Sequence, residues 1–171
     1  MGVTGLLILL QMLLVTVKLL SAAPTTCNIV DPLIRAALEQ EKLMNIPCDF
    51  DEGVSVPEPN MNAEWRKLQT PQQADEVQQG LALLLASAPK VKTFLSKCRL
   101  DWSSHIFSSN TRTLKNVLER FQTQAGAHMA QREARTLAVH TSQQFYTVYR
   151  NFLQGKYKTL LLSECKRAQR K

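Results

Sequence analysis

Four cysteines constrain this chain more than any other feature. Cys27 follows an apolar leader by a few residues and Cys165 lies near the C-terminus, with Cys48 and Cys98 between them. An even number of cysteines in a short exported chain indicates a disulfide framework, because disulfides persist in oxidising compartments and small cores need that support. Four cysteines allow three pairings. The sequence therefore predicts a small secreted domain that is cross-linked from end to end.

The N-terminal segment predicts export. Residues 6–17 are almost entirely apolar, and the small residues at 21–24 offer a signal-peptidase site. An uncleaved membrane anchor is the alternative, but a span needs about 20 consecutive apolar residues, and Lys18 interrupts this run. We expect residues 1–22 to be a signal peptide that is removed and residues 23–171 to form one domain, since a chain of about 150 residues buries a single core.

Long runs of Leu, Gln, Ala, Lys and Glu indicate an all-α fold. Thr70 and Pro71 begin the clearest helix, with a capping hydroxyl followed by a proline at the first helical position. Apolar residues then recur every three or four positions, which places one stripe in the core, and Pro89 should kink or divide this helix. Alternating Val54 and Val56 are typical of a short strand that pairs locally. The expected helices span residues 31–44, 70–98, 110–124 and 137–162.

The connection lengths predict how these helices are ordered. The linker of residues 45–69 is long enough to cross the full height of a bundle, and a simple turn would not need it. If the first two helices run parallel, Cys48 and Cys98 meet at one end, and if the last two run back, the outer cysteines meet at the other. An up-down-up-down bundle would separate Cys48 from Cys98 by a helix length, roughly 30 Å for 20 residues, which no disulfide spans. We therefore expect an up-up-down-down four-helix bundle with two crossover linkers, residues 45–69 and 125–136.

Three segments carry a family resemblance. They read WRK at residues 65–67, QQADEVQQGLALL at 72–84 and VYRNFLQGKYK at 148–158. These segments resemble the erythropoietin/thrombopoietin family of long-chain helical cytokines, whereas residues 96–136 match it poorly. The end cysteines also fall where this family places them, and the position of Cys98 is similar to that in the thrombopoietin branch. The resemblance and the expected topology agree on the pairs Cys27–Cys165 and Cys48–Cys98.

The resemblance implies a secreted, monomeric ligand that dimerises a class I cytokine receptor. Two receptors would bind one ligand and promote the survival, proliferation and differentiation of erythroid cells. In this family a high-affinity face, here called face 1, lies on the fourth helix and the first crossover, and a weaker face 2 lies on the first and third helices. Gln154 stands where an arginine is usual, and Asn60 lies near the expected place of a contacting lysine. The residues implied for face 1 are Asn60, Asn151, Gln154, Gly155 and Lys156, and those for face 2 are Arg35, Ser109, Arg112 and Val117.

Helical spacing adds an expectation about burial. It places Phe152 in the core, Arg112 outward and Val117 on the inward stripe of the third helix. Lys156 is expected in solvent, as charged residues near a helix end usually are. The two tryptophans, Trp65 and Trp102, are expected to be packing anchors.

Other classes of function have less support in the sequence. The three histidines, His105, His128 and His140, lack metal-ligand spacing, so we expect no enzyme, metal or cofactor, and also no nucleic acid partner and no membrane insertion. The chain carries a net charge of +7, which favours an acidic partner or an extracellular polyanion without choosing between them. The alternatives are thrombopoietin-like specificity and, from another class, an amphipathic lipid- or heparin-binding protein.

Overall fold

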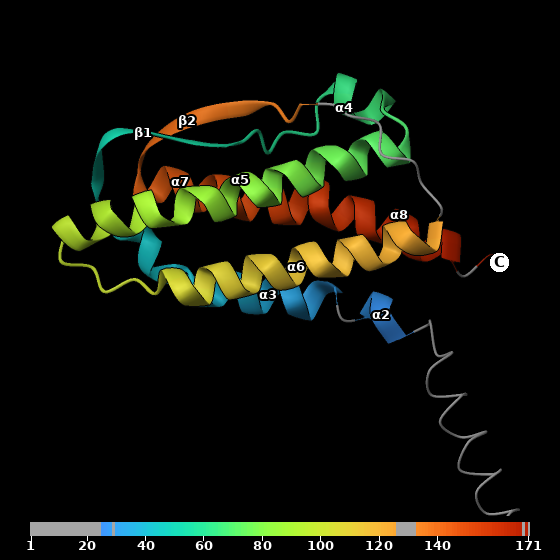
Figure 1. The fold of residues 1–171 in the computed structure, drawn as a ribbon, viewed down its shortest axis with the longest axis horizontal. Coiled ribbons are helices and arrows are strands. Elements are labelled where there is room, and N and C mark those ends of the chain that lie inside the picture. Colours follow the sequence, from blue (N-terminus) through green and yellow to red (C-terminus); the bar gives the residue numbers. More distant parts are fainter. Residues whose placement is uncertain (1–24, 29, 126–132, 169, 171) are drawn as a thin grey trace, which may run out of the picture.

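Four long helical segments form the body of the molecule in the computed structural model, which describes residues 25–28, 30–125, 133–168 and 170 (Figure 1). The predicted leader, residues 1–22, lies outside the described residues. The long segments are α3 (Val30–Gln40), α5 (Thr70–Lys97), α6 (Ser104–Ala125) and a continuous last helix made of α7 (Ser142–Phe152), the π-helical turn η2 (Leu153–Tyr157) and α8 (Lys158–Ala168). The short elements are α2 (Thr25–Asn28), η1 (Lys42–Asn45), β1 (Asp49–Pro57), α4 (Ala63–Lys67) and β2 (Thr136–Thr141).

The second helix follows its sequence pattern closely. Its first residue is Thr70, so Gln69 rather than Thr70 caps it, and the Gln69 N–H donates to Gln72 Oε1 at 3.1 Å. The apolar stripe is buried along the whole helix. Pro89 lies inside α5 and does not divide it. Its neighbours Ala88 and Val91 are buried in the core, and this packing offsets the backbone hydrogen bond that a proline removes.

Two predicted helix starts were wrong. The third helix begins at Ser104 rather than Asn110, because the Ser103 hydroxyl accepts the Ile106 N–H and Phe107 packs its ring 5.3 Å from that of Trp102. The last helix begins at Ser142 rather than 137, where the Thr141 side chain caps it by accepting the Gln144 N–H at 3.1 Å. The predicted packing role of Trp65 and Trp102 is confirmed, since each is 4% exposed.

The strand pairing was only partly anticipated. Val54 and Val56 do lie in a strand and are buried, but β1 pairs antiparallel with β2 far along the chain, and not locally. In this pairing Val54 lies opposite Val139 and Val56 lies opposite Leu137. The two paired strands, β1 and β2, cover α5 on one side of the bundle (Figure 1). The fold is therefore a four-helix bundle with a small two-stranded sheet added along its crossovers.

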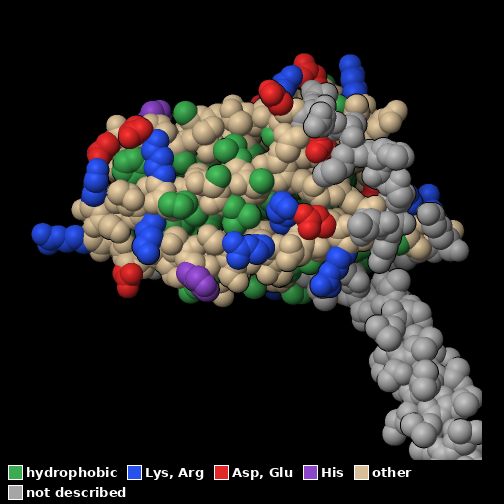
Figure 2. All heavy atoms as spheres, in the orientation of Figure 1, with side chains coloured by type: hydrophobic (Ala, Val, Ile, Leu, Met, Phe, Trp, Pro, Cys, Tyr) green, Lys and Arg blue, Asp and Glu red, His purple; other side chains and the backbone are tan. Residues whose placement is uncertain are grey.

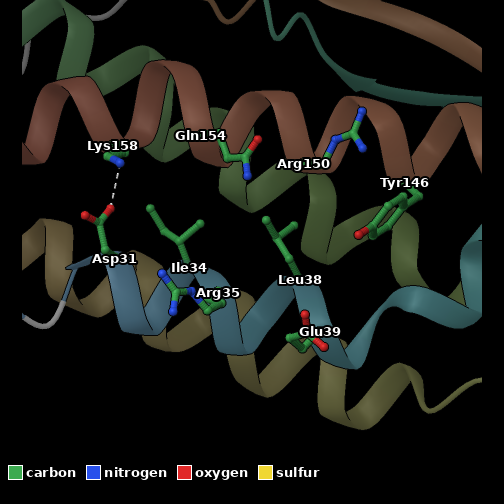
Figure 3. A pocket seen from close by; sticks show the side chains of 9 residues that line it. All are labelled: Asp31, Ile34, Arg35, Leu38, Glu39, Tyr146, Arg150, Gln154 and Lys158. Carbon is green, nitrogen blue, oxygen red and sulfur yellow. Dashed lines mark ion pairs between the residues drawn. The ribbon is translucent and has the colours of Figure 1, made fainter.

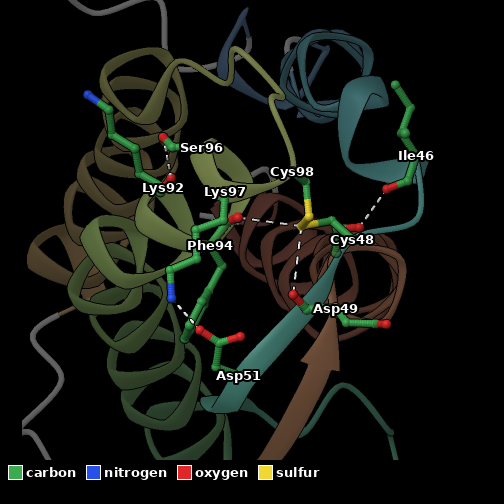
Figure 4. Close-up of a disulfide and its surroundings, with 10 residues drawn as sticks. Ile46, Cys48, Asp49, Asp51, Lys92, Phe94, Ser96, Lys97 and Cys98 are labelled. Atoms are coloured by element: carbon green, nitrogen blue, oxygen red, sulfur yellow. Dashed lines mark hydrogen bonds and ion pairs between the residues drawn. A yellow bond between two sulfur atoms is a disulfide. The ribbon is translucent and has the colours of Figure 1, made fainter.

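The predicted up-up-down-down order is confirmed by contacts at the two ends of the bundle. A disulfide joins Cys48, three residues after η1, to Cys98, at the end of α5, with 5.9 Å between their Cα atoms (Figure 4). The first two helices therefore finish at the same end. The Ser142 N–H donates to the Cys48 carbonyl at 2.9 Å, so the last helix starts at this end. It runs to the other end, where Cys165 is bonded to Cys27 with a Cα separation of 5.8 Å. The third helix also runs downward, from the contact of Asn110 with Gln40 to that of Gln122 with Gln78.

Close packing of the second and fourth helices depends on a glycine. Phe152 is 1% exposed, as its position on the inward stripe predicted. A Cβ atom on Gly80 of α5 would stand 2.6 Å from the Phe152 ring, closer than packed carbons allow. The absence of a side chain at this position thus lets the fourth helix approach α5.

A buried carboxylate lies near the end of the bundle that holds Cys48 and Cys98. Glu41 is 1% exposed and accepts a hydrogen bond from Trp102 Nε1 at 2.5 Å, which links the end of the first helix to the loop before the third. Burial raises the pKa of Glu41 from 4.5 to about 7, and the bond from Trp102 opposes this rise. Its charge also raises the pKa of the buried Tyr149 phenol, after the larger effect of burial on that phenol.

The raised pKa of Glu41 predicts a dependence of stability on pH. The folded state binds the proton of the Glu41 carboxyl more tightly than the unfolded state does. The stabilisation of the fold by this proton is therefore complete below about pH 4.5 and is lost as the pH rises through about 7. We expect the free energy of unfolding to fall between pH 5 and 8, and Glu41→Gln to flatten that fall because the amide accepts from Trp102 without ionising. Urea unfolding at several pH values in this range measures the free energy of unfolding of the unmodified protein and of Glu41→Gln. Parallel pH profiles for the two proteins would contradict the raised pKa of Glu41.

Candidate functional site

Face 1 is a composite of the last helix and the first crossover. Asn151 and Gln154 are exposed on the helix, and Asn60 is exposed on the crossover. The two segments touch at Gly155, since a side-chain carbon there would stand 3.6 Å from the Pro59 carbonyl oxygen. One turn later the Thr159 hydroxyl approaches the Met61 sulfur at 3.5 Å. The structure therefore brings four of the five predicted residues onto one composite surface.

The π-helical turn decides which side chains reach this surface. In η2 the first residue, Leu153, and the last two, Lys156 and Tyr157, are all buried, so Gln154 and Gly155 are the outward positions. A π-helical turn holds an extra residue in one turn of helix, and such turns occur frequently at functional sites. Here it presents Gln154 and Gly155 beside the crossover segment.

Lys156 corrects the sequence prediction. Its side chain is 2% exposed, and its Nζ atom donates to Glu76 Oε1 on α5 and to the Glu58 carbonyl oxygen of the crossover, each at 2.7 Å. The expectation of exposure rested on its charge, whereas its position four residues after Phe152 is that of the inward stripe. Its partner Glu76 is 4% exposed. The sequence signal for this burial was its position directly before Val77 of the apolar stripe.

The Lys156 ammonium connects the two segments of face 1 with the second helix. It ties η2 to α5 through a carboxylate and to the crossover through a backbone carbonyl. With its nitrogen bonded inside the protein, the side chain is not available to a partner. Lys156 is therefore a positioning residue for the crossover, and the surface itself consists of Asn60, Asn151, Gln154 and Gly155.

Removing Lys156 should destabilise the fold. Lys156→Ala removes the cation that Glu76 Oε1 contacts at 2.7 Å, and breaking a buried pair from one side typically costs about 3–5 kcal/mol. Lys158→Ala is the matched control, because Lys158 pairs with Asp31 at the partly exposed surface and such pairs contribute at most about 1 kcal/mol. Chemical unfolding compares the two variants. Equal stabilities would place the Lys156 ammonium in solvent, whereas a partial recovery in Lys156→Met/Glu76→Gln would identify the buried charge of Glu76 as the cause.

Face 2 is less unified than the resemblance implied. Ser109 and Arg112 are exposed on α6, as expected. Val117 is half-buried and packs against the core, so it contributes mainly to the bundle. Arg35 is exposed on α3 but lines a groove together with Gln154 of face 1. The structure thus associates Arg35 with the surface of the last helix.

That groove lies between the first and the last helix and measures about 350 Å³ (Figure 3). Its floor is formed by the buried side chains of Ile34 and Leu38 from α3. The walls are polar and charged. The residues that line it are Asp31, Ile34, Arg35, Leu38 and Glu39 on α3, and Tyr146, Arg150, Gln154 and Lys158 on the last helix.

The His, Cys, Asp and Glu side chains of the described residues do not form a metal centre, since no group of them is arranged to hold a metal ion. The four cysteines are all used in disulfides. Within the same residues, no helix combines the length and the apolar character that crossing a bilayer requires.

The up-up-down-down order with two crossing connections defines the growth hormone and cytokine class of four-helix bundles. Residues 25–169 match the family described as erythropoietin/thrombopoietin. The chain is 32% identical to the erythropoietin of Equus caballus, over 97% of this chain and 96% of the relative. It is 32% identical to that of Epinephelus coioides (92% and 91%) and 28% identical to that of Oryctolagus cuniculus (99% and 100%). The chain belongs to the erythropoietin/thrombopoietin family, a family of cytokine hormones and not of enzymes.

Proposed function

We propose that this protein is a secreted, monomeric, erythropoietin-like hormone that binds two copies of a class I cytokine receptor. Residues 1–22 direct export and are removed, and residues 23–171 form the active domain. Face 1 binds the first receptor, and the exposed part of α6 around Arg112, with the neighbouring surface of α3, recruits the second. The paired receptors then promote the survival, proliferation and differentiation of erythroid cells.

The observation that carries this proposal is the construction of face 1. A crossover loop is fixed to a helix by a buried ammonium, and the exposed polar side chains of both segments lie on one surface. A rigid surface loses little conformational entropy when a partner binds. The two disulfides hold both ends of the bundle and so maintain the geometry between face 1 and α6.

Binding to lipid or heparin fits the structure less well. The apolar stripes of the helices are packed against one another in a cross-linked bundle, so they are not available to a lipid surface. Lys and Arg side chains are spread along the face drawn in Figure 2 and do not gather into one patch. Several lysines also pair with carboxylates, namely Lys90 with Glu52, Lys97 with Asp51 and Lys115 with Glu119.

The second candidate is a thrombopoietin-like hormone that acts through a different receptor of the same class. The observation that favours it is the disulfide between Cys48 and Cys98. This bond fixes the end of the first helix to the end of the second, and the placement of Cys98 is similar to that of the thrombopoietin branch. The two candidates share the fold and the two-receptor mechanism and differ in the receptor that is bound.

A panel of class I receptor ectodomains tests the proposal and separates the candidates. The erythropoietin and thrombopoietin receptor ectodomains, together with unrelated members of the class, are titrated with the purified protein. We expect one ectodomain to bind and to form a complex of two receptors per ligand, as read by light scattering. Binding to the thrombopoietin receptor alone would select the second candidate, and no binding to any ectodomain would overturn the proposed function.

Substitution of Arg112 should separate binding from signalling. Arg112 is exposed on α6, on the far side of that helix from the buried Leu114 and Leu118, so Arg112→Ala should change the free energy of unfolding by at most about 0.5 kcal/mol. We expect the variant to bind one receptor with unchanged affinity, to fail to recruit the second, and to compete with the unmodified protein. Receptor phosphorylation in responsive cells measures this effect. Normal signalling at a limiting dose would remove Arg112 from the second binding surface.

A further inference from the structure

The groove between the first and last helices carries two guanidinium groups that pair with no carboxylate of the described residues. Arg35 lies on its α3 side and Arg150 on its α7 side (Figure 3). The Arg150 guanidinium lies 5.9 Å from the centre of the Tyr146 ring, an arrangement that orients it without neutralising its charge. Among the described residues no carboxylate forms an ion pair with Arg35 or Arg150.

The carboxylates of the groove are already engaged. Asp31 pairs with Lys158 at 2.8 Å, at one end of the groove. Glu39 pairs at 2.5 Å with Lys42, which does not line the groove. The charge that remains for a partner to neutralise is therefore that of the two arginines. Gln154 of face 1 also lines the groove and adds an uncharged hydrogen-bonding amide next to them.

We propose that this groove receives an acidic segment of the first receptor, whose carboxylates bind Arg35 and Arg150. The inference rests on the proposed function and extends face 1 from the crossover across the last helix to the first. Charge complementarity identifies the occupant, because a guanidinium binds a carboxylate in a paired, planar geometry. Arg150 lies one helical turn before Gln154. It therefore places a cation next to the uncharged amide of Gln154.

A receptor peptide fits the groove better than a sulfated polysaccharide does. The floor is apolar, formed by Ile34 and Leu38, and the two arginines are single side chains on opposite walls. A polysaccharide of high charge density binds best to a long, continuous row of cations, which two arginines on opposite walls do not provide. An acidic side chain flanked by apolar ones matches both the floor and the walls.

The test compares Arg35→Gln, Arg150→Gln and the double variant with Lys92→Gln, which removes the same charge from an exposed position on α5 outside the groove. The affinity of the first binding step is measured by surface plasmon resonance with the ectodomain that the panel identifies, at low and at physiological salt. We expect the double variant to lose about tenfold or more in affinity and to show a weaker salt dependence. Arg150→Lys should bind better than Arg150→Gln because it keeps the charge.

Each outcome bears on a separate claim. If the ectodomain binds the unmodified protein and the groove variants bind like Lys92→Gln, the groove proposal is overturned while the proposed function stands. Loss of binding to a heparin oligosaccharide without loss of receptor affinity would also overturn it, in favour of a polyanion. If no ectodomain binds the unmodified protein, the proposed function and the groove proposal both fail. Equal melting temperatures of the variants ensure that an affinity loss reflects contact and not unfolding.

Discussion

The surface of this hormone depends on one ammonium group inside it. Lys156 reaches from the last helix to a carboxylate on the second helix and to a carbonyl of the first crossover. A buried cation is stable only when its partners are held in place, so its two hydrogen bonds must form together. Beyond Pro57, where the pairing of β1 with β2 ends, this ammonium helps to hold the crossover against the last helix. Its position beside Gly155, and hence the composition of face 1, follows from an interaction that no partner molecule touches.

The order of the helices was predictable from the sequence, because it depends on quantities that a sequence states directly. The length of residues 45–69 and the positions of the four cysteines allow one helix order far more readily than the others, and the apolar stripe of the second helix identifies its buried side. The pairing of β1 with β2 was not predictable in the same way. Val54 and Val56 show a strand by their alternation, but their partners at 137–139 are far along the chain, and their short apolar sequence also suits a helix.

The sequence predicted most of the residues of the candidate surface, but only part of how they are arranged. Exposed polar residues on the last helix follow from helical spacing, and the structure exposes Asn151 and Gln154 as expected. Lys156 was misassigned because a charge was assumed to lie in solvent, although its spacing from Phe152 pointed inward. Arg150 and the groove were missed altogether. A groove is formed by two helices at a particular rotation, and a single helix pattern contains no information about that rotation.

The pairing of Cys27 with Cys165 also determines the order of events during synthesis. A chain enters the secretory compartment from its N-terminus, at about 5–20 residues per second, so Cys27 and Cys48 are both present before either native partner arrives. Cys98 follows and can close the upper end of the bundle while the last helix is still being made. Cys27 must wait for nearly the whole chain. Cys27 therefore lacks its native partner until the end of translocation, and an early bond to Cys48 would have to be broken by thiol–disulfide exchange before the native pairs form.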